Sequence, residues 1–179
     1  MRNIEDLNLF TNLGIEDNIE IAGFKAKINN IQETLEFIDN LSNSCCDGCI
    51  IQLMDADGIA GKRHLLHGII HSINAFKRGK NLANDLGIEI CIRLSAQRQI
   101  SRALDILGLK KGEMNIAVVF INCPDYFIDE LSATFHRDDN VLDSNNILDE
   151  IYNISKKELD IMNIEDILID KTTELIVEL

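Results

Sequence analysis

Two nearly unbroken apolar segments constrain the fold of this chain more than any other feature of its sequence. The segments CIIQLMDA (49–56) and NIAVVFIN (115–122) are typical of buried strands. The segment IEIAGFKAKI (19–28) also has strand character, and EICIRL (89–94) predicts a further strand with one solvated face. These segments predict a sheet at the centre of the fold.

Helical spacing of apolar residues is found between and after the expected strands. It occurs at 30–41, at 62–79, in a helix that follows Ser95, from Pro124 to about Phe135, and at 163–179. Ser95 is expected to be the N-cap of its helix, and Gly108 is expected to form a left-handed cap at its end. Ser155 and Glu158 predict a capping box.

The remaining segments complete the expected organisation. Residues 136–146 are polar and predict a loop, and residues 147–179 predict a helical C-terminal part. The connections are irregular in length, which favours an α+β fold over a regular doubly wound sheet. A chain of 179 residues is ample for one domain. We therefore expect a single domain over 1–179, with one mixed or mainly antiparallel sheet flanked by helices.

The charge of the chain is distributed unevenly. The net charge is −13, yet residues 58–112 contain ten Lys or Arg and three acids, a local balance of +7 that leaves −20 for the remainder. Such asymmetry is typical of a surface that binds a polyanion. The alternative is chance clustering on a solvated face. The sequence alone leaves both interpretations open.

The segment 62–79 predicts a helix with two distinct faces. Its apolar residues fall on one arc of the helical wheel, and the opposite arc carries His64, His67, His71, Asn74 and Arg78. We expect this polar stripe to be exposed or to face a ligand, and imidazoles can contact phosphates or bases. Lys62 and Arg63 lie in the first turn of this helix, where the helix dipole makes a positive charge unfavourable. Their presence there therefore indicates a functional role and not a contribution to stability.

Two possible metal sites are weighed against simpler interpretations. Cys46 and Cys49 precede His67 and His71, which suggests zinc as an alternative, but the spacing between the pairs is longer than in a zinc finger. Asp55 and Asp57 offer carboxylates for a divalent cation and would suit a metal-dependent enzyme. At the end of a strand and before Gly58 they more often form a turn.

The sequence contains no set of residues that predicts an active site. The tripeptide at 136–138 resembles a kinase catalytic loop, but Asp143 stands where that motif requires Asn. The N-terminus has no apolar signal region and no apolar run is long enough to span a bilayer. We expect a cytoplasmic protein with reduced cysteines, no membrane partner, no cofactor and no small-molecule substrate.

Residues 55–112 resemble the PRPK-binding protein (TPRKB-like) family, the accessory subunits of the KEOPS complex. The resemblance covers most of 19–122 and is most specific in the middle third. The residues that carry it are Gly61, His64, Ala75, Phe76, Gly79, Asn81, Glu89, Gln99, Ile100, Ala103 and Gly108. The N-terminal extension and the C-terminal third are less recognisable.

The resemblance implies a non-catalytic subunit of the complex that installs threonylcarbamoyl on tRNA adenosine. Such a subunit binds and regulates the atypical kinase/ATPase of KEOPS, and archaeal-type members bind the single-stranded 3′ CCA end of tRNA. We expect the kinase to meet an apolar helical surface at Leu175, Ile176 and Leu179. The expected RNA-binding residues are Lys62, Arg63, His64, Lys77, Arg78, Lys80, Arg98 and Arg102.

Overall fold

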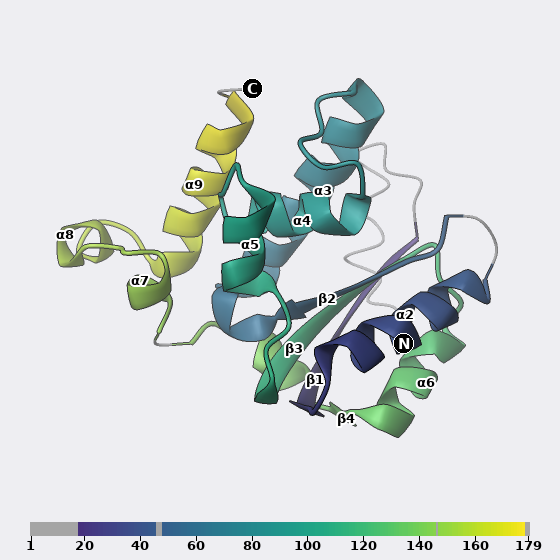
Figure 1. Cartoon of the computed structure of the whole chain (residues 1–179). Coiled ribbons are helices and arrows are strands. Elements are labelled where there is room, and N and C mark those ends of the chain that lie inside the picture. Colours follow the sequence, from purple (N-terminus) through teal and green to yellow (C-terminus); the bar gives the residue numbers. More distant parts are fainter. Residues whose placement is uncertain (1–17, 46–47, 146, 178–179) are drawn as a thin grey trace.

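The centre of the fold is a four-stranded antiparallel sheet. The computed structural model describes residues 18–45, 48–145 and 147–177 (Figure 1). The strands are arranged in the order β2-β3-β1-β4. Their bounds are β1 Ile19–Ile28, β2 Ile50–Asp55, β3 Gly112–Ile121 and β4 His136–Arg137. The α+β fold with a mainly antiparallel sheet is therefore confirmed.

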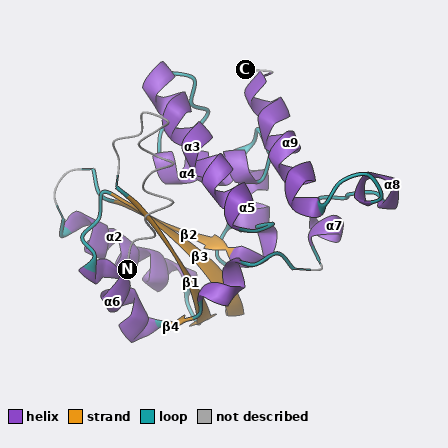
Figure 2. Ribbon diagram, turned by 180° about the vertical axis from the view of Figure 1, so that it is seen from behind, coloured by secondary structure: helices purple, strands orange, loops and turns teal. Residues whose placement is uncertain are grey.

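The two faces of the sheet carry separate helical layers, as Figures 1 and 2 show. Even-numbered residues of β1 and β3, such as Phe24 and Val118, form a core cluster with α2 (Ile31–Asn43) and α6 (Tyr126–Thr134). Odd-numbered residues such as Val119 face three further helices, α3 (Lys62–Arg78), α4 (Leu86–Leu94) and α5 (Ile100–Leu107). This division follows from the alternation of side chains along a strand.

The helix α3 (Lys62–Arg78) is covered on more than one side. Leu65, Ile69 and Ile73 are buried in the core cluster, as the apolar arc predicts. On another side α3 approaches α4 (Leu86–Leu94) so closely that a Cβ at Gly68 would lie 2.5 Å from Leu94 Cδ2. The C-terminal helix α9 (Ile164–Val177) packs along α3 as well.

The expected strand at 89–94 is wrong, because these residues belong to the helix α4. The Asp85 carboxylate accepts a hydrogen bond from Ile88 N at 2.9 Å and caps this helix. Residues Glu89 to Leu94 are all buried, so the segment lacks the polar face that marks a surface helix. A short, fully buried helix cannot be distinguished from a buried strand by periodicity alone.

Two expected caps are also corrected. Ser95 ends α4 and donates its hydroxyl to Cys91 O at 2.7 Å, whereas α5 (Ile100–Leu107) begins after Gln99. Gly108 has a φ of −74°, so it is not a left-handed cap. The capping box of Ser155 and Glu158 is confirmed at the start of α8 (Lys156–Leu159).

The C-terminal part is helical, and the segment before it is more ordered than predicted. The expected loop 136–146 contains β4 and the 3-10 helix η2 (Asp139–Leu142). A second 3-10 helix, η1 (Ala56–Gly58), follows β2, and α7 (Leu148–Ile151) precedes α8. In Figure 1 α7 and α8 lie beyond α9, away from the sheet. None of the helices in the described ranges is long and apolar enough to span a membrane.

Candidate nucleic-acid interface

His64 does not lie on an exposed stripe. Its side chain is fully buried. Its Nδ1 accepts a hydrogen bond from Ala60 N at 3.1 Å and its Nε2 donates to Leu94 O at 3.0 Å, which defines a neutral ring. Burial lowers the pKa of His64 to about 4. The expectation that this ring contacts RNA is wrong, because both nitrogens have partners in the interior.

The rings of His67 and His71 are in contact on α3, with their planes tilted by 59°. Their ring centroids are 4.3 Å apart, and His67 Nε2 lies 3.2 Å from Thr173 Oγ1 on α9. Both side chains are partly buried, and burial lowers both pKa values, that of His71 to about 4. His67 therefore faces another helix of the same chain.

The zinc alternative is not supported by this arrangement. Cys49 packs in the core cluster on the α2 and α6 face of the sheet, whereas His67 and His71 lie beside α9 on the other face. Cys46 lies outside the described residues. Within the described ranges no group of three or more His, Cys, Asp or Glu side chains is placed to hold a metal ion.

Arg63 has a structural partner that the sequence did not predict. Its guanidinium pairs with Glu165 at 3.3 Å and with Asp166 at 3.1 Å, both on α9. The same Glu165 carboxylate accepts hydrogen bonds from Arg63 N and His64 N at 3.0 and 3.3 Å. Glu165 thus caps the N-terminus of α3 from a helix about 100 residues further along the chain, and the cation in the first turn is balanced by it.

The glycine before α3 makes room for this capping carboxylate. Gly61 has a φ of +123°, and a Cβ there would lie 2.8 Å from Glu165 Oε1. A side chain at this position would be strained and would push Glu165 away. Gly61 therefore has a structural explanation that is independent of RNA binding.

The expected RNA-binding cations do not form one cluster. Lys77, Arg78 and Lys80 are exposed at the C-terminal end of α3, about 25 Å from Lys62 and Arg63 for a helix of this length. Cations at a helix C-terminus are favourable without any ligand. The remaining two lie in a third place, Arg98 just before α5 and Arg102 on it.

Arg98 and Arg102 line a groove of about 690 Å³ between the α4–α5 loop and the C-terminal helices. Lys171 on α9 adds a third cation, and Glu174 is the acidic residue in the lining. The N-terminal end of α5 also lies at this groove, and no described side chain caps its backbone N–H groups. Free N–H groups at a helix N-terminus attract anions, as the three cations do. The remaining lining residues are Ser95, Ala96, Gln97, Gln99, Ile151, Tyr152, Asn153 and Leu175.

A buried ion pair within α4 anchors the α3–α4 loop, and the backbone of the same helix binds α9. Glu89 and Arg93 of α4 are both buried, and Arg93 Nε donates to Glu89 Oε1 at 2.8 Å. Glu89 Oε2 accepts from Leu82 N and Ala83 N, which fixes the α3–α4 loop. On the opposite side, Thr172 Oγ1 of α9 donates to Arg93 O at 3.0 Å. These contacts fix α9, and with it Lys171, relative to α4.

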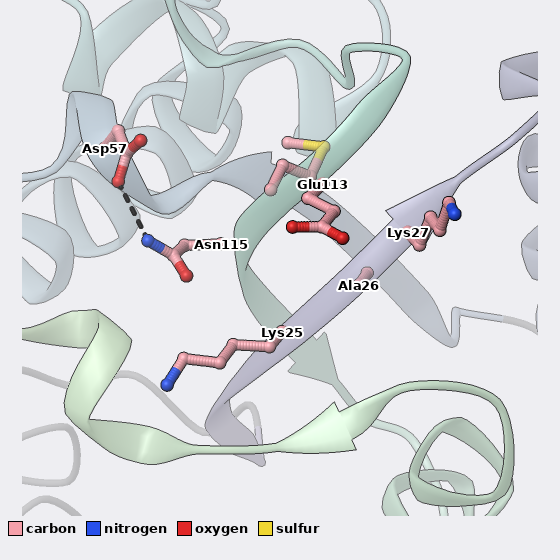
Figure 3. Close-up of a pocket in the computed structure, with 7 residues that line it drawn as sticks. Lys25, Ala26, Lys27, Asp57, Glu113 and Asn115 are labelled. Carbon is pink, nitrogen blue, oxygen red and sulfur yellow. Dashed lines mark hydrogen bonds between the residues drawn. The ribbon is translucent and has the colours of Figure 1, made fainter.

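The residues Asp55 and Asp57 form a turn. Asp55 pairs with Lys110 at 2.6 Å and accepts a hydrogen bond from Asp57 N, and Asp57 accepts from Asn115 Nδ2 at 3.1 Å. Asp57, Asn115, Lys25 and Glu113 line a hollow of about 480 Å³. Figure 3 shows the hydrogen-bonded Asp57 and Asn115 at one side of it. Both carboxylates therefore have partners within the chain, and the structure shows them in the turn that the sequence favoured.

The expected kinase-binding residues are placed only in part. Leu175 is buried and packs in the core cluster, so it is not part of an exposed surface. The side chain of Ile176 and all of Leu179 lie outside the described residues. Exposed apolar side chains are found instead on α5, where Ile100 is 44% and Leu104 is 36% exposed.

Comparisons with known proteins place the chain in a family. The sequence model of the family described as Kinase binding protein CGI-121 matches residues 26–173. The chain belongs to this family. The match runs from β1 into α9 and includes the C-terminal third, which the sequence resemblance did not reach.

Two curated relatives are similar to parts of the chain. The regulatory protein Cgi121 of Methanocaldococcus jannaschii is 40% identical over 67 residues, 37% of this chain and 43% of the relative. The KEOPS complex subunit Cgi121 of Pyrococcus abyssi is 33% identical over 98 residues, 54% of this chain and 53% of the relative. The chain spans about half the length of the curated relatives it matches.

For this member of the CGI-121 family, the groove contains one cation that sequence reasoning missed. Lys171 lies on α9, about 70 residues from Arg98 and Arg102. Lys171 lies near Asp170 and Glu174 in an acidic helix, so the local charge pattern does not indicate an anion-binding residue. Only the docking of α9 against α4 brings it to the groove.

Proposed function

We propose that this protein is a non-catalytic, cytoplasmic subunit of a KEOPS complex that binds and regulates the kinase subunit and binds tRNA. The observation that carries the proposal is the match of the kinase-binding CGI-121 family over residues 26–173. The names of the two relatives, a regulatory protein and a KEOPS complex subunit, agree with it. The absence of a catalytic role is supported by the structural partners of Asp55, Asp57 and His64.

The kinase is proposed to dock on α5. Protein interfaces have apolar centres, and Ile100 and Leu104 are exposed one turn apart on this helix. On the helical wheel they lie on the side of α5 roughly opposite Arg102. A kinase bound at Ile100 and Leu104 would leave the cationic groove open.

Co-purification with the kinase subunit of KEOPS from the same organism tests this proposal. The wild-type protein is expected to co-elute with the kinase as a complex, and Ile100→Glu with Leu104→Glu is expected to weaken it at least tenfold. Leu35→Glu on α2 is the matched control, because Leu35 is 43% exposed. A wild-type protein that elutes without the kinase contradicts the function, and an unaffected double variant contradicts only the surface.

The groove at Arg98, Arg102 and Lys171 is proposed to hold the tRNA. Guanidinium and ammonium groups neutralise phosphates, and the free N–H groups at the start of α5 add donors for the same oxygens. Unpaired bases stack on Arg planes, so a single-stranded end such as CCA suits a groove of this size. Contacts of Lys62, Lys77, Arg78 and Lys80 with RNA stay predictions, and these residues lie at the two ends of α3, outside the lining of the groove.

A further inference from the structure

Three thiols meet at one end of the sheet, on the face that α2 and α6 cover. Cys45 follows α2, Cys49 precedes β2, and Cys123 follows β3. All three pack against the core cluster of that face. The thiols of Cys45 and Cys123 are near enough to that of Cys49 to influence its pKa. The proposed KEOPS function uses none of them.

Strand pairing brings Cys49 and Cys123 together. Ile50 of β2 is paired with Ile121 of β3, so the residue before Ile50 lies beside the residues that follow Ile121. The Cys123 thiol lies 3.2 Å from the carbonyl oxygen of Ile50, the residue that follows Cys49, so the two cysteines are neighbours at this end of the sheet. Neighbouring residues on adjacent strands have Cα separations of about 4.5–5.5 Å, which a disulfide can bridge.

A residue in the left-handed conformation turns Cys123 toward Cys49. Even-numbered residues of β3 face α2 and α6, so continued alternation would place Asn122 there instead of Cys123. Asn122 has a φ of +55° and exchanges hydrogen bonds with Asn18, which interrupts the alternation. As a result the Cys123 side chain lies on the Cys49 face, and its thiol donates to Ile50 O at 3.2 Å.

The two thiols differ in exposure. Cys49 is partly exposed, whereas Cys123 is buried. Burial, together with the neighbouring Cys123, raises the pKa of Cys49 to about 12, and burial also raises the pKa of Cys123. Both groups are therefore thiols at neutral pH, so disulfide exchange is expected to be slow there and to accelerate as the pH rises. Because Cys49 is the more exposed of the two, an external disulfide reaches it before Cys123.

We propose that Cys49 and Cys123 are a modification site that a low-molecular-weight disulfide converts into an intramolecular disulfide. Cys49 gives up its proton and attacks the reagent, forming a mixed disulfide and releasing one reduced thiol. Cys123 then attacks the Cys49 sulfur, gives up its proton and releases the second reduced thiol. Two cysteine thiols are oxidised and one reagent disulfide is reduced, so that atoms and electrons balance.

Oxidation of the full-length native protein with oxidised glutathione tests the proposal. Of the five thiols in the chain, three are expected to remain after treatment, and a reductant should restore all five. Cleavage before Asp separates the candidate partners, since Cys49 falls in 47–54, Cys123 in 105–124, and Cys45 with Cys46 in 39–46. Mass spectrometry is expected to find peptide 47–54 joined to peptide 105–124.

Three variants serve as controls. Cys91→Ser removes a thiol that is buried in the core on the other face of the sheet, so the same cross-link should form at the wild-type rate. Cys46→Ser should also leave the cross-link unchanged. Cys49→Ser should abolish it without loss of the remaining thiols. A native protein that keeps all five thiols, or that joins peptide 39–46 instead, overturns the proposal and leaves the KEOPS function untouched.

Discussion

At the scale of single residues, the roles of several charged side chains differ from those their local sequence suggests. Lys62 and Arg63 look misplaced in the first turn of α3, yet Arg63 is paired with Glu165 and Asp166. His64 is on the polar arc of its helix but is buried and neutral. In each case the partner comes from α9 or α4, which local sequence cannot reveal.

The capping role of Glu165 can be separated from its charge. Glu165→Ala removes the acceptor for Arg63 N and His64 N together with the ion pair, and we expect it to lower the free energy of unfolding by about 1–2 kcal/mol. Glu165→Gln keeps an acceptor oxygen and should cost less than half as much. Urea unfolding measures the free energy of unfolding of both variants. If both lose the same amount, the charge of Glu165 stabilises the fold and its role as a hydrogen-bond acceptor does not.

Buried His64 predicts a stability that falls with acidification. Its pKa of about 4 in the folded state lies below the ordinary value of 6.5, so the unfolded chain binds the proton more tightly. Stability is therefore full above pH 6.5 and is lost as the pH falls toward 4. Between pH 7 and pH 5 the loss is about 2 kcal/mol for this residue. Urea midpoints that do not change between these pH values would contradict the neutral ring.

Among the helices and strands, the sequence predicted those whose apolar residues recur with a clear period. It missed those whose structure depends on contacts with distant parts of the chain. The strand β1 and the helix α3 were predicted to within one residue. The helix α4 was mistaken for a strand because it is covered on all sides and its polar residues form a buried ion pair. The short β4 and η2 were missed because two to four residues carry no periodicity.

The buried ion pair of α4 should behave as a coupled unit. Arg93→Met leaves Glu89 charged and buried, and we expect a loss of about 3–5 kcal/mol in the free energy of unfolding. Combining it with Glu89→Gln removes the unpaired charge while an amide oxygen still accepts from Leu82 N and Ala83 N. The double variant should therefore be more stable than Arg93→Met alone. A double variant with additive losses would contradict the coupling.

At the scale of the whole molecule, the acidic chain carries its cations in separate places. The middle third of the sequence predicted a basic surface, but α3 holds its cations at opposite ends and pairs Arg63 with α9. The groove combines two cations of that middle third with Lys171 from the C-terminal helix. The fold could be predicted in outline because periodicity is local, whereas this site depends on how distant helices dock.

The proposed tRNA site of this CGI-121 family protein is the groove beside α5, and equilibrium filter binding at about 150 mM salt tests it. Wild-type protein should bind tRNA with an affinity that falls steeply as salt rises. Arg98→Glu with Arg102→Glu should bind at least tenfold more weakly and still co-purify with the kinase. The exposed pair Lys156→Glu with Lys157→Glu on α8 undergoes the same charge change and should bind like the wild type. A groove variant that binds tRNA as tightly as the wild-type protein would contradict the claim.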